Sequence, residues 1–265
     1  MEMQFRSTRD LFGNRTFSAS ELADSVFYTM VRVEKGPSLV EDVKRVLGIP
    51  DWEEFVPDGA LENKISCARE WISLHEPGLE SFIDHWGQKV IWIAPPGNNL
   101  SNTLSSVSLP ECPLHVFLTK MAFFHLPPSG TNSCQEYCFC ENLLHESLHL
   151  FLGANMDADR LYYSKAEAYE TFLVPSWRES LWSFDQCIHG YFVYKTVGFL
   201  RYKYALPKIL HATAQECASE LERTILQWSS NHFTDYGRSW IDWFMRFSGE
   251  EIYNILVLIE KTPVP

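Results

Sequence analysis

The 265-residue chain lacks a basic excess, because 22 Lys and Arg stand against 34 Asp and Glu, giving a formal net charge of -12. Binding a nucleic-acid backbone requires basic side chains that neutralise phosphates, so we expect no nucleic-acid partner. The chain also lacks the roughly eighteen consecutive apolar residues of a membrane-spanning helix. Its first residues, Met1 to Arg6, have no apolar core of a secretion signal. We therefore expect no membrane partner and a cytoplasmic location.

The seven cysteines have neither the even number nor the regular spacing of a disulfide scaffold. This set is typical of a reducing compartment, where cysteines pack mainly as small hydrophobic residues. Cys134, Cys138 and Cys140 form the densest group, but a helix would spread them over different faces, which disfavours a structural zinc site there. With 46% apolar residues the chain can bury a full core.

Helical spacing of apolar residues dominates the sequence, which predicts a mainly α fold with a small β-sheet. Segments 89–94 and 114–118 predict strands, the second continuing through about residue 126. The helical segments are 20–33, 38–47, 65–74, 79–86, 134–152, 164–173, 184–202, 212–228 and 240–259. We expect one domain, 1–265, with a helical part over about 1–105 and a metal-binding part over about 106–265. Helix 134–152 should pack near the sheet and against later helices.

One motif in helix 134–152 indicates a metal site: His145-Glu146-Ser147-Leu148-His149 has the form His-Glu-x-x-His. Residues four apart lie on one face of a helix, so both imidazoles can bind one metal ion while Glu146 points beside it. Ser133 and Glu136 have the form of a capping box, and Gly153 stands where a left-handed C-cap is expected. The alternative interpretation, two core histidines, is less favoured.

A third protein ligand should come from a later element. In a zinc peptidase with a Glu ligand, it would be Glu167 or Glu170 on the following helix, with Glu146 as general base. The other candidate is His189, the next histidine after His149. The residues themselves leave these three alternatives open.

Together with these histidines, two further stretches carry a resemblance: Pro175-Ser176-Trp177-Arg178 and Ile188-His189-Gly190-Tyr191-Phe192 with the apolar helix that follows. In order and spacing, residues 134–202 resemble the HExxH-motif peptide-modification domain found beside ribosomally made precursor peptides. Members of that family include iron(II)- and 2-oxoglutarate-dependent peptide β-hydroxylases.

The resemblance implies an oxygenase that hydroxylates a side-chain β-carbon of a precursor peptide. Its Fe(II) would be held by His145, His149 and His189, leaving three positions for 2-oxoglutarate and dioxygen. Arg178 would bind the far carboxylate of 2-oxoglutarate through two parallel hydrogen bonds. Glu146 would then orient a ligand rather than act as a base. The alternative remains a zinc metallopeptidase.

Overall fold

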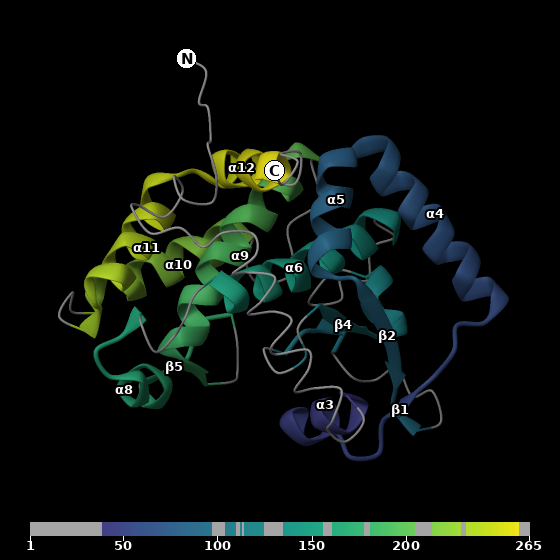
Figure 1. Ribbon diagram of the computed structural model, residues 1–265, viewed down its shortest axis with the longest axis horizontal. Helices are drawn as coiled ribbons and strands as arrows, with labels where there is room; N and C mark the ends of the chain where they lie inside the picture. The colour runs from purple at the N-terminus through teal and green to yellow at the C-terminus, as the bar shows by residue number, and fades with distance from the viewer. Residues whose placement is uncertain are drawn as a thin grey trace, which may run out of the picture. The chain divides into compact units, whose positions relative to one another are not determined.

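The computed structural model describes residues 39–96, 104–109, 112, 114–124, 135–155, 161–177, 181–204, 214–228 and 232–259 (Figure 1). The chain divides into two compact units at the bond between Phe151 and Leu152. The expectation of a mainly α fold with a small sheet is confirmed. None of the described helices has the length and hydrophobicity of a membrane span. The expected helix 20–33 lies outside the described residues.

A four-stranded mixed sheet forms the centre of the first unit. It consists of β1 (Glu53–Glu54), β2 (Lys89–Ala94), β3 (Ser106–Val107) and β4 (His115–Leu118), in the order β1-β2-β4-β3. The central strands β2 and β4 run parallel, whereas each edge strand is antiparallel to its neighbour. The strand predicted at 89–94 is confirmed, and the one predicted at 114–118 begins one residue later.

The expected continuation of β4 through residue 126 is wrong in its described part. After Leu118, the Thr119 hydroxyl accepts the backbone N–H of Met121 at 3.0 Å and caps a 3-10 helix, η2 (Lys120–Phe123). A hydroxyl cap of this kind satisfies an otherwise unpaired amide. The chain therefore turns at Thr119 instead of staying extended.

The helices of this unit are α3 (Leu39–Leu47), α4 (Gly59–His75), α5 (Pro77–Trp86) and α6 (Gln135–Asn155), whose last turn enters the second unit. Local signals fix their ends. Gly48, at φ 65°, ends α3 in the left-handed region that glycine adopts without strain. The Asp58 carboxylate accepts the Leu61 N–H at 2.9 Å and starts α4. The helices predicted at 38–47, 65–74 and 79–86 are confirmed, the second in a longer form.

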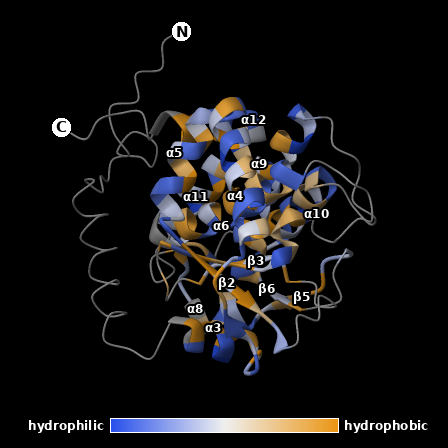
Figure 2. Cartoon of the chain, turned by 90° about the vertical axis from the view of Figure 1, so that its right-hand side faces the viewer, coloured by the Kyte–Doolittle hydropathy of each residue, from blue (hydrophilic) through white to orange (hydrophobic). Residues whose placement is uncertain are grey.

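Successive side chains of a strand point to opposite faces of the sheet, and each face packs against a different set of residues. On one face, Ile93 and Phe117 pack in a buried cluster with Val43 of α3. On the other, Trp92 stacks on Phe139 of α6, with ring centroids 6.3 Å apart and planes 7° apart. In Figure 2 the helices mix hydrophilic and hydrophobic residues, and β2 is mainly hydrophobic. The sheet thus packs directly against α6, as expected.

Helix α6 agrees with the predicted helix 134–152 except at its C-terminal end. It continues through Asn155, so Gly153 lies inside the helix. The left-handed C-cap expected at Gly153 is therefore wrong. Ser133, the expected N-cap, lies outside the described residues.

Helices dominate the second unit. They are α8 (Lys165–Glu170), α9 (Phe184–Lys203), α10 (Ala214–Gln227), α11 (Asp235–Arg246) and α12 (Gly249–Ile259), with a hairpin of β5 (Phe172–Leu173) and β6 (Trp182–Ser183). Helix α9 is its centre and packs against α10 and α12. It begins with a capping box, in which Ser183 and Gln186 each accept the other's backbone N–H. The helices predicted at 184–202 and 212–228 are confirmed within two residues.

Two predicted helices of this unit are wrong in their extent. Segment 164–173 is helical only to Glu170, because the following residues pair as β5 with β6. Segment 240–259 is two helices, α11 and α12. The second helix begins at a capping box, in which the Ser248 hydroxyl accepts the Glu251 N–H at 3.2 Å and the Glu251 carboxylate accepts the Ser248 N–H at 2.8 Å. A Cβ placed on Gly249 would lie 2.2 Å from the Lys195 backbone oxygen. Only a glycine allows α12 to begin this close to α9.

Candidate metal centre

His145 and His149 lie one turn apart on α6, and their side chains converge. Their Nε2 atoms are 3.2 Å apart, and the ring centroids are 4.9 Å apart. Two nitrogens about 2.1 Å from one ion, at an angle of about 100° to each other, would be separated by about 3.2 Å. Both imidazoles are half-buried beside the fully buried Leu144 and Leu148. The pair therefore has the separation that one bound zinc or iron ion requires.

Glu146, between these histidines in the motif, is buried and bound at both carboxylate oxygens. The Ser106 hydroxyl donates to Oε1 at 2.6 Å, and the Ser108 hydroxyl donates to Oε2 at 2.7 Å. Only 4% of Glu146 is exposed, so these hydroxyls take the place of water around a buried charge. We call Ser106 and Ser108 the serine pair. The sequence analysis did not identify it.

A buried amide extends this network along α6. The Asn142 side-chain oxygen lies 2.8 Å from the Ser105 hydroxyl and 3.1 Å from that of Ser106. Its nitrogen donates to the backbone oxygens of Cys138 and Ala122, each at 2.9 Å. Several connected hydrogen bonds thus join the β3 segment to the face of α6 that carries Asn142 and Glu146.

The candidate carboxylate ligands lie in the second unit. Glu167 is in the first turn of α8, and its Oε1 lies 3.1 Å from the Nδ1 of His232. Glu170 is the last residue of α8 and is exposed. In the part of the chain that the structure describes, no three His, Cys, Asp or Glu side chains gather into a metal-binding group. The choice of third ligand stays a prediction.

His189, the third candidate, is half-buried on α9. Burial lowers the pKa of its imidazole, and the negative charge of Asp185, one turn earlier, opposes that effect in part. Asp185 in turn accepts the Tyr162 hydroxyl at 2.7 Å, and burial together with this carboxylate raises the pKa of Tyr162. The neutral imidazole, which is the metal-binding form, is therefore favoured at His189.

Arg178, the expected cosubstrate ligand, lies outside the described residues. Its neighbour Trp177 makes edge contacts with Trp182 and Tyr194, at centroid distances of 6.3 and 6.1 Å. A cavity of about 300 Å³ lies between Ser176, Trp177 and the polar face of α10. The Ser176 N–H donates to Glu220 of that helix at 2.7 Å. These contacts attach the segment before Arg178 to α10.

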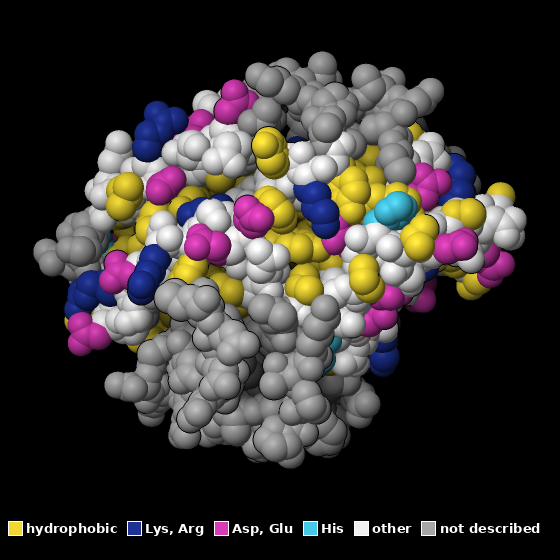
Figure 3. Space-filling view, turned by 90° about the horizontal axis from the view of Figure 1, so that it is seen from above, with side chains coloured by type: hydrophobic (Ala, Val, Ile, Leu, Met, Phe, Trp, Pro, Cys, Tyr) yellow, Lys and Arg dark blue, Asp and Glu magenta, His cyan; other side chains and the backbone are white. Residues whose placement is uncertain are grey.

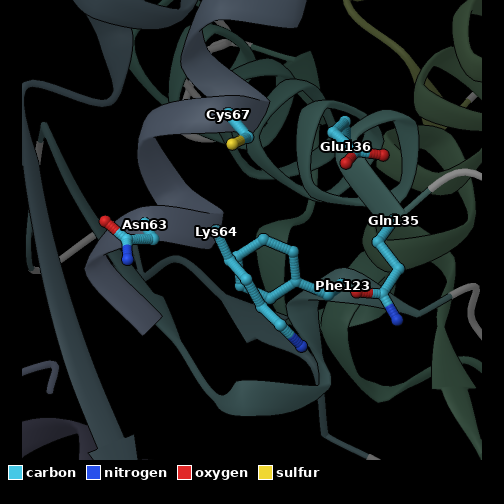
Figure 4. Close-up of a pocket in the computed structure, with 6 residues that line it drawn as sticks. All are labelled: Asn63, Lys64, Cys67, Phe123, Gln135 and Glu136. Carbon is cyan, nitrogen blue, oxygen red and sulfur yellow. The ribbon is translucent and has the colours of Figure 1, made fainter. Parts of the chain in front are cut away.

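A second cavity, of about 160 Å³, lies between α4, η2 and the start of α6 (Figure 4). Lys64 extends along the Phe123 ring, with its ammonium 5.9 Å from the ring centroid. Asn63 and Cys67 of α4 also line the cavity, together with Gln135 and Glu136 of α6. None of the predicted site residues lines this cavity, so it is separate from the candidate metal centre.

On the face drawn in Figure 3, acidic and basic side chains are interspersed with hydrophobic ones, and neither sign forms a broad patch. Compared with protein-family models and with curated proteins, the chain matches none. The residues of the site itself therefore have to indicate the function.

Proposed function

We propose that the protein is an iron(II)- and 2-oxoglutarate-dependent oxygenase that hydroxylates a β-carbon of a ribosomally synthesised precursor peptide. The observation that carries the proposal is the convergence of the His145 and His149 Nε2 atoms, 3.2 Å apart, beside a carboxylate occupied by the serine pair. The first part supports a metal site. The second supports a positioning role for Glu146 rather than the general-base role that a zinc hydrolase requires.

In this proposal the residues of the chain bind the metal ion and the cosubstrate and orient them. His145 and His149 hold the ion together with His189, and Arg178 binds the distal carboxylate of 2-oxoglutarate. Leu144 and Leu148 are fully buried beside the pair and keep water from that side. When bound, iron(II) with 2-oxoglutarate would activate dioxygen, the oxidant that hydroxylates an unactivated C–H bond while 2-oxoglutarate is converted to succinate and carbon dioxide.

The second candidate is a zinc metallopeptidase with Glu167 or Glu170 as third ligand. The same histidine pair favours it, and Glu146 would then deprotonate a zinc-bound water. Glu167 contacts His232 and would have to leave that contact to bind a metal ion, whereas Glu170 is exposed.

Glu146→Gln separates the two candidates. A serine hydroxyl can donate or accept, so the glutamine amide can retain both contacts with the serine pair, and we expect the variant to fold. As an oxygenase it should keep measurable 2-oxoglutarate-dependent hydroxylation, whereas a peptidase should lose hydrolysis by about three orders of magnitude or more. Glu146→Ala, which removes both contacts, is the matched comparison.

The direct measurement loads the protein anaerobically with iron(II) and adds 2-oxoglutarate. We expect a visible charge-transfer band and, once oxygen is admitted together with a peptide encoded by a neighbouring gene, release of succinate. Tightly held zinc with peptide cleavage, or neither signal, would overturn the proposal.

A further inference from the structure

The serine pair lies at the end of β3: Ser106 is in the strand, and Ser108 directly follows its last residue, Val107. Ser106 and Ser108 are two residues apart and therefore point to the same side, where both reach Glu146. Val107 between them packs against the buried cluster of α3 and the sheet. Pairing of β3 with β4 places Ser106 opposite Leu118 and Val107 opposite Phe117, and Ser108 follows directly after this paired segment.

Each hydroxyl has two acceptors in reach and a single proton to donate. Ser106 lies 2.6 Å from Glu146 Oε1 and 3.1 Å from Asn142 Oδ1. Ser108 lies 2.7 Å from Glu146 Oε2 and 3.4 Å from the Glu146 backbone oxygen. A charged acceptor at the shorter distance binds the proton more strongly. Both hydroxyls therefore act on the carboxylate.

Asn142 and Glu146 form one stripe of α6, and His145 and His149 form the adjoining one. Neighbouring residues of a helix differ by about 100° in direction, so any rotation of α6 about its axis turns both stripes together. A contact that holds Glu146 against β3 consequently also sets the direction in which the two imidazoles point.

We propose that Ser106 and Ser108 are positioning residues of the candidate metal centre: by holding both oxygens of Glu146 they fix the rotation of α6 and the convergence of His145 with His149. This inference rests on the proposed metal-dependent function. The serine pair acts through Glu146 and does not itself bind the ion.

The test uses cobalt(II) as the metal probe, with ligand-field absorption and titration of the full-length chain as readouts. Ser108→Thr and Ser108→Val have nearly the same shape and differ in the hydroxyl, and both suit a strand. We expect Ser108→Thr to bind cobalt(II) as the unaltered protein does. Ser108→Val should bind about tenfold or more weakly, with a changed spectrum. Ser106→Ala should behave like Ser108→Val.

The matched control is Ser73→Ala, which removes a hydroxyl bound to the Glu80 carboxylate on the exposed surface of the same unit. It should leave cobalt binding unchanged. Equal affinities and spectra for the Thr and Val variants would overturn the positioning role but not the metal centre. If the unaltered protein binds no cobalt(II), the proposed function fails and this inference fails with it. Should Ser106→Ala not fold, the Thr and Val variants of Ser108 decide alone.

Discussion

At the scale of single residues, close backbone contacts restrict which amino acids a position can hold, as the metal-binding motif does at its own positions. Gly237, in the first turn of α11, lies against the backbone of Leu161, and a Cβ there would be 2.1 Å from the Leu161 oxygen. Gly198, within α9, differs, because a Cβ would meet its nearest atom, the backbone nitrogen of Gln215, at 3.5 Å. The same substitution should therefore have opposite effects at the two sites.

Gly237→Ala should lower the free energy of unfolding by about 3 kcal/mol, because backbone atoms cannot move aside as a side chain can. Gly198→Ala should raise it by about 0.5 kcal/mol, since alanine favours a helix interior and the contact is ordinary. Urea unfolding followed by circular dichroism measures both. Similar effects for the two variants would refute the steric argument.

At the scale of elements, the helix starts depend on local hydrogen bonds that the sequence itself encodes. The start of α9 is the strongest example, since the Ser183 hydroxyl accepts the Gln186 N–H at 3.2 Å and the Gln186 side chain accepts the Ser183 N–H at 2.8 Å. This helix also contains His189, so the position of its first turn determines where in the helix that imidazole lies.

Ser183→Ala should reduce the free energy of unfolding by about 1 kcal/mol through loss of the cap. The control is Ser219→Ala on α10, where an exposed hydroxyl donates to the Gln215 backbone oxygen one turn earlier. A change within about 0.5 kcal/mol is expected there. Chemical denaturation compares the two, and a control as costly as Ser183→Ala would contradict the capping role.

At the scale of the whole molecule, stability should depend on pH through His189. Burial lowers the pKa of His189 from its ordinary value of 6.5, so below about pH 6.5 the unfolded chain binds a proton that the folded chain resists. The free energy of unfolding must then fall as the pH drops through this range.

Metal-free protein should therefore unfold at lower urea concentration at pH 5.5 than at pH 7.5. The difference should be smaller in His189→Gln, which cannot take up that proton. Identical pH dependence in the two proteins would show that His189 does not contribute. Measuring both proteins without metal separates this effect from ligand binding.

The sequence predicted most helices because their signals are local. Apolar spacing depends on residues within one or two turns. At α4 the predicted helix 65–74 began too late, because the cap at Asp58 was not recognised. The prediction failed at β5 because that strand depends on a distant contact, its pairing with β6. It also failed at the break between α11 and α12, although the signal there is local, because Ser248 and Glu251 form a capping box. Convergence of His145 and His149 followed from their spacing, whereas the serine pair reaches Glu146 only after β3 has paired with β4.

The alternation of Ser106, Val107 and Ser108 has a use beyond this chain. The hydroxyls lie 40 and 38 positions before the glutamate they bind, and their two-residue period follows from strand geometry rather than from any catalytic need. A Ser-x-Ser step on a short strand about 40 positions upstream of His-Glu-x-x-His is thus a pattern to search for in other genomes. Chains that carry it should share a glutamate whose two carboxylate oxygens both accept serine hydroxyls.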